Sequence, residues 1–422
     1  MVISWVLIRM SFPIWRFMLS DALDICLSAI NSCLPDQAVK EELKKLDLQG
    51  PVYLLAAGKA AYTMAKAACE VLDVKAGIVI SKYNHIKGDL PHIRTFEAGH
   101  PLVDENSVKA TKELIDMVSN LSSDDKVVFL LSGGASALLE MPLIPLEELI
   151  AINDQMLKKG LDIYEINTIR KKLSMIKGGG LARICAPAAV YGIILSDVIE
   201  DRLDVIGSGP SVTDESTAQE ALDIIKKYDL QLSPKALQVI EESEPWIVNN
   251  AKNTIIGSVR ILCQNACLKA KELGYQPVLL CDKVTLEARE AGDLLSEEIL
   301  KHENDQKTAL IMGGETVVKV KGNGKGGRCS ELVFSQIEHL KGLEGVLLMA
   351  LGSDGTDGPT DAAGGWIDGH SADKLAASGI SFSAILENND SYNGLKALDQ
   401  LVFTGPTGTN VNDLMIALIS RA

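Results

Sequence analysis

Residues 127–140 read Val-Val-Phe-Leu-Leu-Ser-Gly-Gly-Ala-Ser-Ala-Leu-Leu-Glu, an apolar run followed by a glycine turn and a helical segment. Val127–Leu131 is wholly apolar, which is typical of a parallel strand buried on both faces. Ser132, Gly133 and Gly134 interrupt the run, since glycine permits positive φ and close backbone approach, and the first amides of the next helix face outward. The pattern predicts an anion-binding turn, although such turns also serve simply to pack a helix tightly on a sheet.

Composition limits the classes of protein that this chain can represent. With 422 residues, 47% of them hydrophobic, the chain can bury a large core, and we expect two domains of ordinary size. The 41 Lys and Arg residues against 56 Asp and Glu give a net charge of −15. A nucleic-acid partner needs a basic face, so we expect none, and local cations must hold any anionic substrate.

Cysteine usage and the N-terminal segment bear on the location of the protein. The eight cysteines include no Cys-x-x-Cys pair, which favours reduced thiols and a cytoplasmic location. The segment from Met1 to Met18 is apolar but is interrupted by Arg9, Pro13 and Arg16, so it is too short and too broken to span a membrane. We expect a surface extension there, or a true start near Met18.

Short apolar runs alternate with helical patterns in the N-terminal half, which predicts βαβ units and an α/β fold with a parallel sheet. The expected strands cover residues 52–56, 76–80, 93–97, 127–131 and 189–195. Lys59, the turn residues Ser132, Gly133, Gly134, Ala135 and Ser136, and Asp197 each follow the end of a strand. Because parallel sheets bind ligands at the carboxyl ends of their strands, these residues should share one edge.

The C-terminal half contains further expected strands and a helix. Residues 254–256 and 277–280 are expected strands that flank a helix over 261–273. Residues 307–323 read as a hairpin, with a turn at Gly313-Gly314 followed by alternating residues. Further strands are expected at 345–351 and 401–403.

The standard nucleotide fingerprints are absent. The chain has no Gly-x-x-x-x-Gly-Lys-Ser/Thr loop, and its first strand ends in Ala57-Gly58-Lys59-Ala60-Ala61, which lacks the Gly-x-Gly-x-x-Gly of nicotinamide cofactor domains. At the start of a helix, the Lys59 ammonium suits a phosphoryl or carboxylate oxygen. The alternative is an ordinary solvated lysine.

Arg328 follows the glycine-rich loop Gly322–Gly327, which is flexible enough to bring its guanidinium onto a phosphate. A solvated charge at the exit of the expected hairpin is the alternative. His100, in Ala98-Gly99-His100-Pro101, reads as a turn residue rather than a base.

Carboxylates at strand ends are candidate ligands for Mg²⁺, which uses one or two protein carboxylates together with substrate phosphates. Asp354 and Asp357 lie in a loop rich in Gly and Thr after an expected strand. Aspartate is also frequent in ordinary turns, so this assignment stays open. Asp197 has the same ambiguity, and it could instead accept a proton from a substrate hydroxyl.

Seven motifs, taken in order, resemble the glycerate 2-kinase family, whose C-terminal module is called MOFRL. They are Ser132-Gly133-Gly134, Asn167-Thr168-Ile169-Arg170-Lys171, Lys177-Gly178-Gly179, Leu195-Ser196-Asp197-Val198, Gly313-Gly314-Glu315-Thr316, residues 354–365 from Asp354-Gly355-Thr356-Asp357, and residues 404–413 from Thr404-Gly405-Pro406-Thr407. The resemblance extends from about residue 20 to the C-terminus.

The resemblance implies ATP-dependent phosphorylation of D-glycerate at its 2-hydroxyl, with Mg²⁺. It also implies a cleft between a Rossmann-like domain (19–250) and a smaller α/β MOFRL domain with a mixed sheet (251–422), whose last strand and tail pack back on the first domain. It also implies a monomer or homodimer. Lys59 and Arg328 match the lysine and arginine proposed to be catalytic in the family. Arg170, Lys177 and Glu315 are implied to bind nucleotide or substrate.

Two departures and two rival functions remain. The family usually has a further Gly where this chain has Ala135, and Asn-Gln after the arginine where this chain has Cys329-Ser330. The family has sometimes been called hydroxypyruvate reductase, an NAD(P)H-dependent activity that the missing dinucleotide fingerprint disfavours. A non-catalytic phosphosugar sensor would normally bring a DNA-binding segment, and none is visible in the sequence.

Overall fold

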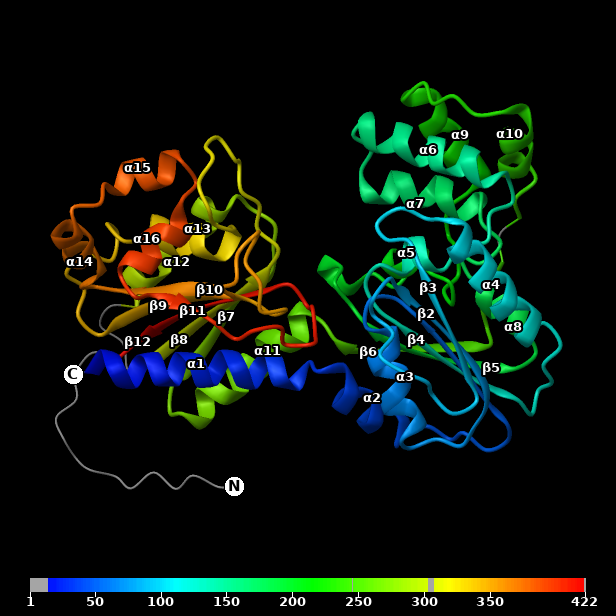
Figure 1. Ribbon diagram of the computed structural model, residues 1–422, viewed down its shortest axis with the longest axis horizontal. Helices are drawn as coiled ribbons and strands as arrows, with labels where there is room; N and C mark the ends of the chain where they lie inside the picture. The colour runs from blue at the N-terminus through cyan, green and yellow to red at the C-terminus, as the bar shows by residue number, and fades with distance from the viewer. Residues whose placement is uncertain (1–13, 245, 303–306, 421–422) are drawn as a thin grey trace. The chain divides into compact units, whose positions relative to one another are not determined.

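The computed structural model describes residues 14–244, 246–302 and 307–420. They form two compact units (Figure 1). The first unit contains Cys33–Ser258 and Gly408–Val411. The second contains the described residues up to Ser32, Val259–Thr407 and the described residues from Asn412 onward.

The first unit is built on a six-stranded sheet in the order β3-β2-β1-β4-β5-β6, with every neighbouring pair parallel. Its strands are β1 (Val52–Ala57), β2 (Val74–Lys82), β3 (Ile93–Ala98), β4 (Lys126–Leu131), β5 (Ala189–Leu195) and β6 (Ala251–Gly257). This is the doubly wound order of Rossmann-type domains, so the predicted fold class is confirmed. The order reverses between β1 and β4, which is where such sheets bind ligands.

Helices join and cover these strands. They are α2 (Pro35–Leu43), α3 (Ala61–Cys69), α4 (Glu105–Val118), α5 (Ala135–Leu138), α6 (Leu146–Lys158), α7 (Ile163–Lys172), α8 (Gly180–Cys185), α9 (Ala218–Lys227) and α10 (Pro234–Glu241), with 3₁₀ turns η1 (Ile199–Asp201) and η2 (Ile206–Ser208). Side chains fix several helix starts: Asp104, Asp162 and Thr217 each cap an amide of the helix that follows. Helices α6, α7, α9 and α10 share a core of their own, which includes Ile152 and Ile169, and this holds α6 against α7 (Figure 1).

The second unit contains a mixed sheet in the order β11-β10-β9-β12-β8-β7. Its strands are β7 (Gln276–Val284), β8 (Thr308–Gly314), β9 (Val346–Gly352), β10 (Gly364–Asp368), β11 (Leu401–Val402) and β12 (Asp413–Ile419). Only β7 and β8 are parallel; the other neighbours are antiparallel. The predicted mixed sheet is therefore confirmed.

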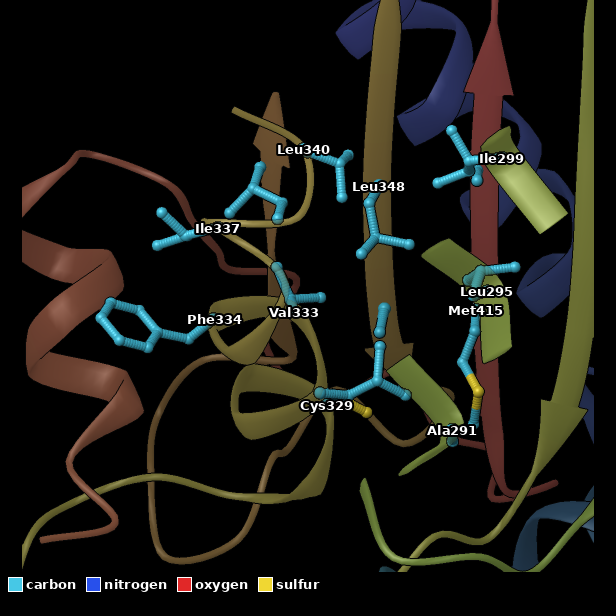
Figure 2. Packing of buried hydrophobic residues seen from close by; sticks show 14 of the residues in the cluster. Ala291, Leu295, Ile299, Cys329, Val333, Phe334, Ile337, Leu340, Leu348 and Met415 are labelled. Atoms are coloured by element: carbon cyan, nitrogen blue, oxygen red, sulfur yellow. The ribbon is translucent and has the colours of Figure 1, made fainter. Parts of the chain in front are cut away.

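Helices cover both faces of the mixed sheet (Figure 1). They are α1 (Ile14–Ser32), α11 (Val259–Glu272), α12 (Ala288–Lys301), α13 (Arg328–Ser335), α14 (Ser371–Ser378), α15 (Phe382–Glu387) and α16 (Ser391–Ala397). Helices α1 and α11 lie on one face. Helices α12 and α13 lie on the other, where Val333 and Leu295 meet Leu348 and Met415 of the sheet (Figure 2). This packing fixes α13, which begins at Arg328.

The predicted hairpin over residues 307–323 is wrong. Gly313 and Gly314 do not turn but continue β8, and they pair with Leu414 and Asp413 of β12. Beyond them, residues 316–321 form only an isolated bridge, between Val317 and Glu287. The physical reason is that the wholly buried run of β12, more apolar than the alternating segment, takes the place beside β8. Neither β12 nor β10 is predicted by the sequence analysis.

The chain divides elsewhere than between residues 250 and 251. Strand β6 begins at Ala251 yet pairs with β5, so the first unit extends to Ser258. Helix α1 belongs to the second unit, and Gly408–Val411 to the first. Among the described residues, no single helix is long and apolar enough to cross a membrane, and only the bent pair of α1 and α2 passes that test, on length and composition alone.

Candidate active site

Two strand ends are bonded together at the point where the sheet of the first unit reverses its order. The Lys59 amide, after β1, donates to the Gly133 carbonyl, after β4, over 2.9 Å. The Ala60 amide donates to Ser132 Oγ over 3.0 Å. The two turns therefore form one rigid edge at the carboxyl ends of β1 and β4, where the sheet argument places them.

Asp197, after β5, reaches the same edge. Its Oδ2 lies 3.9 Å from Lys59 Nζ, and both side chains are partly exposed. Gly133 permits this approach, because a Cβ on that residue would lie only 2.0 Å from Asp197 Oδ2. The ammonium and the carboxylate thus meet over a bare stretch of backbone, open to solvent and to a ligand.

Gly134 has two reasons to be glycine. Its φ is +89°, and a Cβ would lie 2.8 Å from His100 Cδ2. It precedes α5, a helix of only four residues, and the first amides of a helix have no intrahelical partner. Ala135, where the family usually has glycine, is buried in the core and has helical geometry, so its Cβ is accommodated.

His100 belongs to this edge although the sequence analysis set it aside as a turn residue. Burial lowers its pKa, and the charges of Lys59, Lys82 and His85 lower it further. The surroundings of the imidazole are therefore positive, which suits an anion. Its position two residues after the end of β3 was the available signal, since that strand ends at the same edge of the sheet.

Lys177 and Glu140 lie beneath α5. The Lys177 side chain is fully buried, and its ammonium donates to the carbonyls of Ser136 (2.9 Å) and Leu139 (3.1 Å) and lies 2.9 Å from Glu140 Oε2. Burial lowers the pKa of Lys177, while Glu140 acts in the opposite direction. These three acceptors match the three protons of an ammonium. Lys177 therefore stabilises the segment that directly follows the glycine turn. Its predicted contact with a ligand stays a prediction.

Arg170, on α7, is half-buried and borders a cavity that also reaches Gly134 and Ser136. Its Nε donates to Asn153 Oδ1 over 2.7 Å. Burial lowers the pKa of Arg170 and Glu140 raises it, but a guanidinium keeps its charge at any physiological pH. Arg170 is therefore a permanent cation on a cavity next to the glycine turn.

Arg328 is the centre of a cluster in the second unit. Its Nε and Nη2 donate to Oδ2 (2.5 Å) and Oδ1 (3.0 Å) of Asp413, and its Nη1 donates to Glu315 Oε1 over 2.8 Å. Glu315 directly follows β8 and Asp413 begins β12, and these strands are paired, which brings the two carboxylates to one end of the sheet. The two-pronged bond to Asp413 fixes the plane of the guanidinium.

Asp413 was not among the predicted site residues. Its side chain is 2% exposed. Burial raises its pKa to about 7, although the hydrogen bonds from Arg328 act to lower it. The family motif over residues 404–413 ends at this residue, but its contact with Arg328 depends on the pairing of β12 with β8, which the sequence analysis does not predict.

The predicted metal ligands differ in how much of their carboxylate remains available. Asp357 is buried and accepts from the amides of Cys329 (2.9 Å) and Ser330 (2.8 Å), so it caps α13. Burial raises its pKa. In the part of the chain that the structure describes, the Asp354 carboxylate accepts one hydrogen bond, from the amide of Thr356 over 2.9 Å. Within the described ranges, no group of three or more His, Cys, Asp or Glu residues is arranged to hold a metal ion.

The sheet order and the edge formed by Lys59, Gly133 and Asp197 define a doubly wound α/β protein with its candidate site at the switch point. Comparison with family models narrows the class. Residues 21–241 match a model described as "Domain of unknown function (DUF4147)", and residues 308–413 match the MOFRL family.

Two known proteins that are similar over nearly the whole chain are named glycerate 2-kinase, and a third relative has another name. D-glycerate 2-kinase of Thermotoga maritima is 47% identical over 94% of this chain and 97% of its own length. Glycerate 2-kinase of Pyrococcus horikoshii is 38% identical, covering 91% of each chain. A relative from Agrobacterium vitis, 36% identical over 88% of this chain and all of its own, is provisionally named hydroxypyruvate reductase.

A solved structure agrees with these relatives. The crystal structure of glycerate kinase from Thermotoga maritima matches with a TM-score of 0.93 and 46% identity, covering 96% of this chain and 100% of that one. The chain belongs to the glycerate 2-kinase family, and the family predicted from the seven motifs is confirmed.

Proposed function

We propose that the protein transfers the γ-phosphoryl group of ATP to the 2-hydroxyl of D-glycerate, giving 2-phosphoglycerate and ADP. The observation that carries this proposal is the meeting of Lys59 and Asp197, 3.9 Å apart, over the bare glycine turn at the switch point of the sheet. The names of the relatives from Thermotoga and Pyrococcus point to the same reaction.

In the first unit, each group has a separate task. The backbone from Gly133 to Ser136 offers amides to phosphate oxygens, whereas the Ser132 amide is bonded to the Ala57 carbonyl. The Lys59 ammonium neutralises the charge that these oxygens carry in the transition state. Asp197 accepts the proton of the attacking hydroxyl. Positioning and charge, rather than covalent chemistry by the protein, supply the acceleration.

In the second unit, Arg328 offers a fixed cation. Asp413 and Glu315 engage one donor on each of its three nitrogens, so, counting the described residues, two of its five N–H donors remain for phosphoryl oxygens. Glu315, predicted to bind nucleotide or substrate, accepts directly from Arg328 and so acts through its orientation.

Magnesium ions fit the carboxylates of this chain only in part. Asp354 has an oxygen that could contact a metal held by the nucleotide, whereas both oxygens of Asp357 are engaged by backbone amides. When bound, Mg²⁺ would neutralise charge on the nucleotide phosphates. We therefore propose Asp354 as the better candidate of the two predicted ligands.

The remaining proposals concern partners and location. We infer that the protein is a cytoplasmic enzyme that acts on small molecules, as a monomer or homodimer. We also infer that it binds neither nucleic acid nor a membrane. The eight cysteines are all free thiols, which supports a reducing compartment. The net charge of −15 supports the lack of a nucleic-acid partner.

The test is to incubate the protein with ATP, Mg²⁺ and D-glycerate and to identify the product by ³¹P NMR. We expect 2-phosphoglycerate; formation of 3-phosphoglycerate, or oxidation of NADH with hydroxypyruvate in place of phosphoryl transfer, would overturn the proposal. Lys59→Ala and Arg328→Ala should each abolish most of the turnover while ADP still binds. Turnover near wild type in both variants would remove these residues from the mechanism.

A further inference from the structure

A cavity of about 500 Å³ lies next to the glycine turn, wholly within the first unit. Its lining residues come from α5, α6, α7 and the loop that follows β3. Its lining includes His100, Gly134 and Ser136 near the glycine turn. Its apolar wall is formed by Leu102, Val103, Ile150, Ala151 and Leu157.

The apolar wall is open to solvent at its rim. Leu102 is 67% exposed and Leu157 is 60% exposed. Single exposed leucines are ordinary, but here two exposed leucines line the same cavity as a half-buried isoleucine. Such a surface gains most from a ligand that is itself flat and apolar.

Polar residues also line this cavity. Arg170 is one of them, and in the described part of the chain it makes one hydrogen bond, from Nε to Asn153 Oδ1, so its Nη donors have no protein acceptor there. Glu140, 3% exposed, also borders the cavity. A mostly apolar pocket with a few convergent polar groups is typical of a site for a small organic ligand.

We propose that this cavity receives the purine base of the nucleotide substrate. A purine offers two flat faces to the leucine wall and ring nitrogens that accept from the Arg170 guanidinium. Glycerate, a three-carbon chain with a polar group on every carbon, would gain nothing from an apolar wall of this size.

The cavity and the glycine turn share residues, and this sets the direction in which a bound nucleotide would lie. Gly134 and Ser136 border the cavity and also belong to the turn that we assign to phosphate. The Gly134 Cβ position lies 3.4 Å from Lys59 Cγ. A base in the cavity therefore directs its phosphates along the turn toward Lys59. This inference rests on the proposed function, because it assumes that the donor is a nucleotide.

The test separates the base from the phosphates by calorimetric titration of two probes, ADP and inorganic tripolyphosphate. Ala151→Trp, on the exposed side of α6, fills the cavity and should weaken ADP binding at least tenfold while it changes tripolyphosphate binding less than twofold. Leu157→Glu, at a position already exposed to water, should act in the same direction through its charge. Lys158→Trp is the control, since this residue is on the same helix but does not border the cavity.

The outcomes distinguish this inference from the proposed function. If both cavity variants bind ADP as tightly as wild type, or lose ADP and tripolyphosphate equally, the cavity does not hold the base and the inference is overturned, whatever the product assay shows. If the variants lose ADP selectively while wild type forms no 2-phosphoglycerate from D-glycerate, the inference holds and the proposed acceptor is wrong.

Discussion

The side chain of Asp413 links the orientation of Arg328 to pH. Both carboxylate oxygens accept from the guanidinium, and burial raises the pKa of this carboxyl to about 7. A protonated carboxyl accepts fewer hydrogen bonds, so below that pH the two-pronged hold on Arg328 is weakened. The contribution of Asp413 to the stability of the folded chain has the opposite dependence on pH. Because the pKa of Asp413 is higher in the folded than in the unfolded chain, its contribution to stability is largest in acid and declines as the pH rises through about 7.

We therefore expect kcat with saturating substrates to fall below pH 7. Protonation of Asp413 should not lower the Tm over the same pH range. Asp413→Asn should remove that acid limb and lower kcat at pH 8 at least about tenfold, equivalent to ~1.4 kcal/mol in the barrier. The measurement is a pH profile of kcat beside thermal unfolding at each pH. Asp361→Asn, whose carboxylate contacts Tyr392 and Lys325 instead, is the control. An acid limb that persists in Asp413→Asn would contradict this account.

The Asp357 carboxylate caps the first turn of helix α13. Both oxygens of this carboxylate accept amides of the first helical turn, next to Arg328. Asp357→Ala should destabilise the chain by about 1–3 kcal/mol, because two buried amides lose their acceptor, and should lower kcat as Arg328 shifts. We expect no change in the Mg²⁺ concentration that gives half-maximal rate. A clear rise in that concentration, absent from Asp361→Ala, would show instead that Asp357 is a metal ligand.

The glycine turn allows a matched comparison of strain and contact. Gly134 and Gly160 both have positive φ, +89° and +71°, but a Cβ at Gly134 would meet His100, whereas a Cβ at Gly160 meets nothing within 4 Å. Each change to Ala should destabilise the chain by about 1–2 kcal/mol through backbone strain. Only Gly134→Ala should also weaken the binding of tripolyphosphate. Equal tripolyphosphate affinity in the two variants would mean that the turn does not touch phosphate.

Across the whole molecule, the sequence predicts what depends on neighbouring residues and misses what depends on distant pairing. Apolar runs locate β1, β4 and β5, and the rule that ligands meet strand ends brings Lys59, Gly133 and Asp197 together. Asp413 escapes that reasoning, because it matters only once β12 pairs with β8, some hundred residues earlier in the chain. The boundary differs for the same reason, since α1 precedes the first unit in sequence but packs on the sheet of the second.

This placement of α1 makes a prediction about the stability of the second unit. One stripe of the helix is buried, with Met18, Ala22, Ile25, Cys26, Ala29 and Ile30 each at most 2% exposed. Cys26 contacts Met349 of β9, and Asp21 accepts from the hydroxyl of Tyr275. Each large apolar side chain in such a stripe contributes about 1.5–3 kcal/mol, and a domain is stable by only about 5–15 kcal/mol. Loss of α1 should therefore unfold the second unit.

A chain that begins at Cys33 should expose Val259–Thr407 to limited digestion by trypsin, while the first unit, which has its own sheet and core, stays protected. Mass spectrometry of the fragments measures this directly. A chain that begins at Met18 keeps the buried stripe and is the control, because it should digest like the full chain. Protection of both units in the chain that begins at Cys33 would mean that α11 alone suffices to cover that face of the mixed sheet.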